Sequence, residues 1–193
     1  MNLVNSIDLS GYWKAGRTFE NFFEYVKDLH EKGLVTGDIQ NKELLDYSLL
    51  NEKRMSRIIK HGQSFPVQVE NESPLKYALV ITEGWCGDSA QLLPYFYKWS
   101  VLKNVELKIV GRDDNESLMN EFLTNGSRSV PVMIGLDENF KCIFRWGPRP
   151  AVLTQLVKNW KASGMEKAEM GLHIHQWYTD NKGEAAWKEW EAL

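Results

Sequence analysis

One cysteine of this sequence stands where a thiol could do chemistry. Cys86 occurs in the sequence WCGDS (residues 85–89), directly after the apolar run YALVIT (residues 77–82) and before a helical pattern over residues 89–102. A cysteine just before a helix lies near unpaired backbone N–H groups and the positive end of the helix dipole. Both favour the thiolate, which is the attacking species in disulfide exchange, so we expect a lowered pKa for Cys86.

The neighbours of Cys86 modify this chemistry. The hydroxyl of Ser89 can hydrogen-bond a thiolate but cannot form a disulfide with it. The carboxylate of Asp88 favours the helix start, yet its charge opposes the thiolate and reduces the expected lowering of the pKa. The second cysteine, Cys142, falls within a predicted strand, and we interpret it as a core residue rather than a partner of Cys86.

The elements that must position Cys86 follow from the apolar periodicity. From residue 76 onward the pattern predicts the order β-α-β-α-β-β-α. The first strands are joined by helical crossovers and should be parallel, whereas the last two form an antiparallel hairpin. The predicted strands cover residues 77–82, 105–111, 130–136 and 140–146, and the helices cover 89–102, 115–123 and 151–162.

Helical segments flank this central part on both sides. Residues 1–16 are expected to be an irregular lead-in, followed by amphipathic helices over 18–32 and 41–60 and a connector over 62–75. After Gly164 the chain is mostly helical, and its aromatic residues should dock these helices on the domain. Those residues are Trp177, Tyr178, Trp187 and Trp190. The predicted division is an N-terminal extension (1–74), a core (75–163) and a C-terminal extension (164–193).

Taken together, these residues resemble the thioredoxin superfamily, which carries W-C-G-P-C between a buried strand and a helix. Pro94 falls eight residues after Cys86, where thioredoxins have a proline that kinks the helix. The pair Val130-Pro131 resembles the family's cis-proline, and Gly147 resembles the glycine that lines its substrate groove. The resemblance covers residues 75–162. It implies an α/β, thioredoxin-like core with a mixed central sheet flanked by helices, to which the two helical extensions are added.

The departures from the family pattern bear on activity. Ser89 replaces the second cysteine of C-x-x-C, Asp88 replaces the proline, and Val80 stands where thioredoxins carry a buried acid that assists the resolving cysteine. The dithiol reaction should therefore be impaired or absent. We expect a monothiol oxidoreductase, in which Cys86 attacks a protein or peptide disulfide and an external thiol resolves the mixed disulfide.

The expected site extends beyond the cysteine. The catalytic residues are Cys86 and Ser89, and no cofactor is required, although glutathione or another low-molecular-weight thiol is a candidate for the external thiol. Arg128, Arg149, Trp85 and Trp146 are expected on loops near Cys86, where they could hold that anionic thiol or a peptide. The residues expected to bind substrate are Trp85, Gly87, Asp88, Val130, Pro131, Gly147, Arg128 and Arg149.

Two other functions remain open from the sequence. A redox-inactive module could bind a partner in the groove around Trp85, Pro131 and Gly147 without turnover. An iron–sulfur protein is less favoured, because monothiol glutaredoxins carry C-G-F-S whereas this chain has Asp88 in place of the phenylalanine. No metal site is expected, since His173 and His175 do not share a helix face.

Composition excludes several other classes. The 193 residues contain 23 Lys and Arg against 26 Asp and Glu, a net charge of −3, which gives no broad basic field for nucleic acid. The first residues, MNLVNSIDLSGYWK, lack the pattern of a secretion signal, and no apolar segment is long enough to span a membrane. Two cysteines make no disulfide framework, so we expect a cytoplasmic protein, monomeric or homodimeric.

Overall fold

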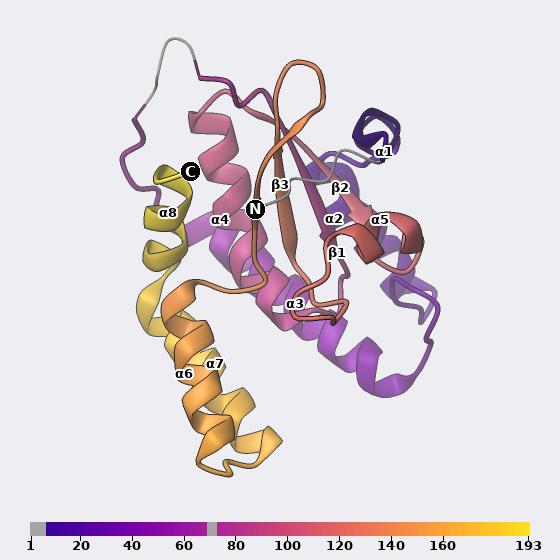
Figure 1. Ribbon diagram of the computed structural model, residues 1–193. Helices are drawn as coiled ribbons and strands as arrows, with labels where there is room; N and C mark the ends of the chain where they lie inside the picture. Colours follow the sequence, from indigo (N-terminus) through magenta and orange to yellow (C-terminus); the bar gives the residue numbers. More distant parts are fainter. Residues whose placement is uncertain (1–6, 69–72) are drawn as a thin grey trace.

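In the computed structural model of the chain, which describes residues 7–68 and 73–193, a mixed sheet lies at the centre (Figure 1). Its strands are β1 (Tyr77–Thr82), β2 (Glu106–Gly111), β3 (Val132–Leu136) and β4 (Cys142–Trp146), in the order β2-β1-β3-β4. β1 is parallel to β2, as predicted for strands joined by a helix. β3 also follows a helical crossover, Glu116–Glu121, but it runs antiparallel to β1, so the prediction of parallel pairing was wrong for this strand. It is antiparallel to β4 as predicted, the sheet is mixed, and the predicted fold class is confirmed.

Alternate residues of the strands build two separate layers of core. Ala78 and Val80 of β1 contribute to one apolar cluster, while Leu79 and Ile81 contribute to the other. This follows from the two-residue period of a strand, which sends successive side chains to opposite faces. All four side chains are completely buried, which explains why the run YALVIT is apolar throughout rather than alternating.

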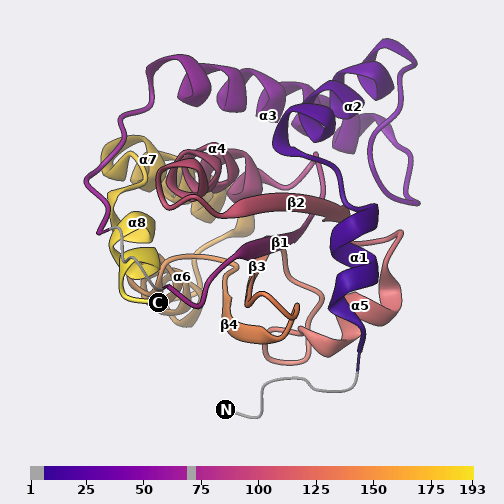
Figure 2. The ribbon, with the colours of Figure 1, turned by 90° about the horizontal axis from the view of Figure 1, so that it is seen from above.

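On one face of the sheet lies α4 (Gly87–Leu102), which begins directly after Cys86. The predicted N-terminal helices are α2 (Phe19–Glu31) and α3 (Lys42–His61), capped by the side chains of Thr18 and Asn41. Figure 2 shows α3 as an outer layer over α4, on the side away from the sheet. Met55 and Ile58 of α3 are buried within the chain, whereas Leu49 and Ile59 of the same apolar stripe stay exposed.

The core ends with α6 (Ala151–Ala162), and the C-terminal extension consists of α7 (Lys167–Asn181) and α8 (Glu184–Glu191). Trp187 and Trp190 are buried, and Trp190 packs against Phe96 and Trp99 of α4. The predicted docking of these helices through aromatic side chains is confirmed for α8. Among the helices that the structure describes, none is both long and apolar enough to cross a membrane.

The sequence prediction was wrong at the N-terminus. Within the expected irregular lead-in, Leu9–Ala15 forms a helix, α1, whose first turn is capped by the side chain of Asp8. Leu9 is buried in the cluster on the face of the sheet opposite α4, together with residues of α5 (Glu116–Glu121). At seven residues, α1 is too short for its apolar period to stand out, and tertiary packing stabilises it. Residues 1–6 of the predicted lead-in lie outside the described residues.

Candidate active site

Cys86 occupies the N-cap position of α4, directly after the strand–helix turn. Its thiol donates a hydrogen bond to the carbonyl oxygen of Val130 at 3.2 Å, and the peptide bond between Val130 and Pro131 is cis. Gly147 lies behind this loop with φ of +116°, and a Cβ added there would lie 2.3 Å from the Pro131 carbonyl oxygen. Only glycine allows so close an approach of the two backbones. Sulfur, cis-proline and glycine therefore meet at one place, as the spacing predicted.

The pKa expected for Cys86 was wrong in direction. Burial, followed by the negative charge of Asp88, raises the pKa of the thiol from an ordinary 9.0 to about 11. Hydrogen bonds from the side chain of Ser89 and from the backbone N–H groups of Ser89 and Asp88 lower it, as expected at a helix start, but by less. The Cys86 side chain sits in an apolar cluster with 8% of the residue exposed, so loss of solvation outweighs the helix N-terminus.

The hydroxyl of Ser89 belongs to a short chain of polar groups. The Thr82 hydroxyl donates to the Ser89 oxygen at 2.6 Å, and both side chains are buried. Because the Ser89 oxygen accepts from Thr82, its own proton is left to point at the sulfur of Cys86. Ser89, which replaces the second cysteine of the family motif, is thus placed to stabilise a thiolate.

The carboxylate of Asp88 is held by groups from two later parts of the chain. Arg149 forms a two-point ion pair with it, at 2.6 Å and 2.9 Å, and the Tyr178 hydroxyl of α7 donates to it at 2.8 Å. The side chain of His175, one turn earlier on α7, lies beside Gly87. The C-terminal extension therefore covers the first turn of α4 on this side of Cys86.

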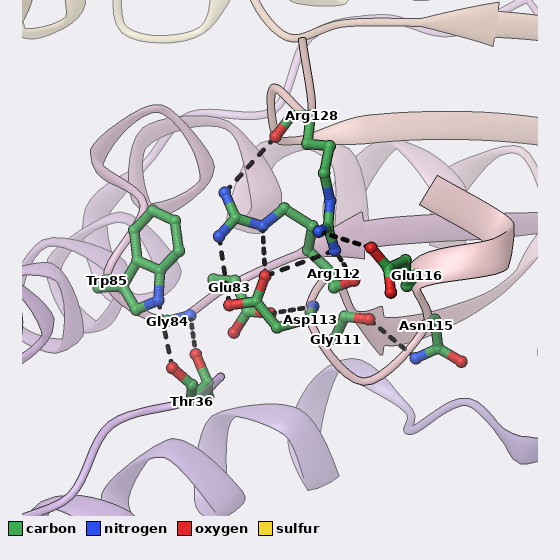
Figure 3. A network of polar contacts seen from close by, with 10 residues as sticks. All are labelled: Thr36, Glu83, Gly84, Trp85, Gly111, Arg112, Asp113, Asn115, Glu116 and Arg128. Atoms are coloured by element: carbon green, nitrogen blue, oxygen red, sulfur yellow. Dashed lines mark hydrogen bonds and ion pairs between the residues drawn. The ribbon is translucent and has the colours of Figure 1, made fainter. Parts of the chain in front are cut away.

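A second polar network fixes the turn before Cys86 on its other side (Figure 3). The Trp85 indole N–H donates to the Thr36 carbonyl oxygen at 3.2 Å, and the Gly84 N–H donates to the Thr36 hydroxyl at 2.8 Å. The guanidinium of Arg112 lies over the Trp85 ring, 4.7 Å from its centroid. The N-terminal extension and the loop after β2 thus hold Trp85 in place.

The same network contains a buried acid that the sequence prediction did not single out. Glu83 is 1% exposed, and it accepts a hydrogen bond from the Asp113 backbone N–H at 3.0 Å. Burial raises the pKa of its carboxyl group. Asp113 in turn pairs with Arg112 at 2.7 Å and with Arg128 at 3.8 Å. The guanidinium of Arg128 is therefore engaged within the protein, with Asp113 and with Glu116.

Comparison with known proteins identifies the family of this chain. The sequence model of a family described as thioredoxin matches residues 37–161, well over half of the chain. The chain belongs to the thioredoxin family. No curated protein matches this thioredoxin-family chain at a significant level.

Two solved structures resemble this thioredoxin-family chain in fold. One is an HIV epitope-scaffold protein, with a TM-score of 0.58, 15% identity and 96% of each chain covered. The other is a protein of unknown function from Pseudomonas aeruginosa, with a TM-score of 0.51, 16% identity, and coverage of 93% of this chain and 99% of that one. At such identities the likeness concerns the fold alone.

Most residues predicted for the site of this thioredoxin-family chain do lie together. Asp88, Ser89, Val130 and Arg149 all contact Cys86 or one another, with Pro131 and Gly147 behind them. Trp146 does not join them, because its indole N–H donates to Glu189 at 2.7 Å and its ring packs against Trp190. Arg128 and Arg149 are present but occupied by carboxylates, so neither offers a free cation to an anionic thiol.

Three contributors to the site were missed from the sequence: Thr82, Tyr178 and Glu83. Thr82 and Glu83 are polar residues at the end of an apolar strand that leads into the motif, and this position is a signal that could have found them. Tyr178 lies 90 residues after Asp88, and nothing in the local pattern indicates their contact.

Proposed function

We propose that the chain is a thiol–disulfide oxidoreductase of the monothiol type. The Cys86 thiolate attacks one sulfur of a protein or peptide disulfide, forms a mixed disulfide, and releases the other sulfur as a thiolate. An external thiol then attacks the mixed disulfide, takes over the substrate sulfur in a new disulfide and restores Cys86. Glutathione or another low-molecular-weight thiol is the proposed external reductant, and a reducing compartment such as the cytoplasm supplies it.

The observation that carries this proposal is the position of the Cys86 sulfur, at the N-cap of α4 and 3.2 Å from the carbonyl oxygen of Val130, the residue before the cis-proline. The hydroxyl of Ser89, oriented by Thr82, and the backbone N–H groups of Ser89 and Asp88 favour the charged form of this sulfur. The carbonyl of Val130 before the cis-proline lies at the sulfur, where an extended substrate chain could pair.

Burial sets the speed of this reaction in the free protein. With the pKa of Cys86 raised to about 11, on the order of 10⁻⁴ of the thiol is ionised at pH 7. Exchange should therefore be slow at neutral pH and rise steeply with pH. This distinguishes the chain from a cysteine activated by the helix N-terminus alone.

The test is adduct formation with glutathione disulfide, followed by intact mass and peptide mapping over pH 7 to 10. We expect one glutathione adduct on Cys86 in the wild type and in Cys142→Ser, none on Cys86→Ser, and its removal by added thiol. Ser89→Ala should form the adduct more slowly, because one donor to the thiolate is lost. The absence of an adduct on Cys86 throughout this pH range would contradict the proposal.

A second candidate is a redox-inactive binding module that uses the groove around Trp85, Pro131 and Gly147. The burial and raised pKa of Cys86 specifically favour it, since binding does not require a thiolate. The variant Cys86→Ala distinguishes the two functions. A binding module keeps its affinity for partner peptides in this variant, whereas the oxidoreductase loses the covalent adduct.

A further inference from the structure

A cleft opens between α3, α4 and α7, on the side of the α4 start where His175 lies. Two adjoining hollows form it, with volumes of about 320 Å³ and about 200 Å³, and they share Arg57, Gln91 and Thr179 as lining residues. We call this space the α3–α7 cleft. Neither Pro131 nor Gly147 lines it, and none of its lining residues belongs to the network of Figure 3.

The α3–α7 cleft is lined by positive charge without negative charge. Lys53, Arg54 and Arg57 of α3 line it together with His175, and no Asp or Glu lines either hollow. Within residues 7–68 and 73–193, none of these three α3 cations forms an ion pair. The guanidinium of Arg54 donates to the Asn51 side-chain oxygen at 2.9 Å, its only hydrogen bond to a described residue. Like charges have thus been brought together with no compensating acid.

The surroundings do not neutralise this charge. Burial and the nearby charge of Arg57 both lower the pKa of Arg54, and burial and the charge of Arg54 lower that of His175. Two acids near His175 are engaged elsewhere: Asp88 pairs with Arg149, and Glu169, in the hollow beyond His175, lies 3.8 Å from His173. An anion in the cleft would relieve the repulsion among these cations.

Gln91 supplies a second, independent observation. Its side chain is buried, with 5% of the residue exposed, and lines both hollows. Within the described part of the chain, no hydrogen bond of its amide is found, and His175 Nδ1, on the same cleft, is fully buried without a hydrogen-bond partner. An amide that is buried among cations and left without a protein partner is placed to bond a ligand.

We propose that the α3–α7 cleft binds a small anion that carries phosphate or carboxylate groups, held by Arg54 and Arg57 and oriented by the Gln91 amide. Guanidinium groups match the geometry of both kinds of oxygen. Gln91 follows Cys86 by five residues on α4, so the anion would lie about 7–8 Å along the helix from the cysteine. The inference does not require exchange at Cys86.

Calorimetric titration of the full chain at low salt tests the inference, with pyrophosphate and citrate as the two probes. We expect millimolar or tighter binding of at least one probe, weakened about tenfold or more in Arg54→Gln/Arg57→Gln. The matched control is Lys158→Gln/Lys161→Gln, which removes two charges from the exposed side of α6 and should bind as wild type does. Binding of pyrophosphate alone assigns phosphate chemistry, and binding of citrate alone assigns carboxylate chemistry.

A second variant guards against a folding artefact, because Arg54 also contacts Asn51. Gln91→Leu keeps the size and the charge of the site, and should weaken binding several-fold. In the wild type, the NMR signals of the Gln91 side-chain amide should shift when the probe is titrated. Cys86→Ser should bind as wild type does, so failure of the exchange reaction would leave this result untouched. Absence of binding by both probes, or full binding by Arg54→Gln/Arg57→Gln, would overturn the inference.

Discussion

Cys86 and Cys142 are both buried free thiols, in the same apolar cluster, and burial raises the pKa of both. Their polar surroundings differ. Cys142 lies within β4 and donates to the Phe144 carbonyl at 3.4 Å, and burial alone accounts for its shift. At Cys86 the charge of Asp88 and three hydrogen-bond donors act in addition. The comparison teaches that polar groups at a helix start can raise or lower the pKa of a thiol, while burial has the largest effect on that pKa.

The largest effect should come from moving the backbone behind Cys86. Gly147→Ala places a Cβ 2.3 Å from the Pro131 carbonyl oxygen at a φ of +116°. We expect the free energy of unfolding to fall by about 2–5 kcal/mol, and Cys86, but not Cys142, to be alkylated faster. Chemical denaturation and mass-resolved alkylation measure the two effects.

Gly164→Ala is the matched control for that variant. Gly164 also has a positive φ, +78°, but no atom lies within 4 Å of an added Cβ. It should show only the backbone strain, of about 1 kcal/mol. An equal loss of stability in both variants would mean that the contact with Pro131 contributes nothing.

The raised pKa of Cys86 should make the free energy of unfolding depend on pH in the alkaline range. The folded pKa of Cys86, about 11, exceeds its ordinary value of 9.0, so the unfolded state releases its proton first as the pH rises. The stabilisation is complete below pH 9 and is lost as the pH approaches 11, a loss of about 2–3 kcal/mol. Wild type should therefore lose more stability than Cys86→Ser between these pH values. Parallel curves for the two proteins would contradict the raised pKa.

A smaller effect is expected from the C-terminal extension. Tyr178→Phe removes the buried hydroxyl that donates to Asp88 while Arg149 keeps its ion pair. We expect a loss of about 1–2 kcal/mol, with faster alkylation of Cys86 and no change at Cys142. The exposed Tyr47, changed to Phe, serves as control. Unchanged stability in Tyr178→Phe would show that α7 does not hold the start of α4.

The smallest effect concerns charge. Asp88→Asn removes a negative charge that raises the pKa of Cys86. At pH 8 Cys86 should therefore react several-fold faster with iodoacetamide, measured in a Cys142→Ser background. An unchanged or slower rate would show that burial alone sets the pKa, as it does at Cys142.

Much of the fold could be read from the sequence because its signals are local. The run YALVIT and the caps Thr18 and Asn41 each depend on short stretches of chain. The spacing of Cys86, Pro131 and Gly147 could be recognised through the resemblance to thioredoxins. The site was less predictable where it depends on tertiary structure. Burial of Cys86 and the contact of Tyr178 with Asp88 arise only once distant segments pack together, and burial reversed the direction of the expected pKa shift.

The arginines also show that the sequence does not reveal which cations are paired in the folded protein. Arg128 and Arg149 are expected from the sequence to hold an anion because they fall on predicted loops near Cys86, yet the structure pairs both with carboxylates. Arg54 and Arg57 belong to an ordinary amphipathic helix in the sequence and carry no motif. Only the placement of α3 beside α4 and α7 brings them to Gln91 and reveals an unpaired cluster.

The most direct test of the account is the rate of Cys86 alkylation as a function of pH, measured in Cys142→Ser with Cys86→Ser as the blank. The account predicts a slow rate at neutral pH that rises with a midpoint near 11, well above the ordinary 9.0. A midpoint below the ordinary value, with fast reaction at pH 7, would contradict it and would show that the helix start, rather than burial, controls the thiol.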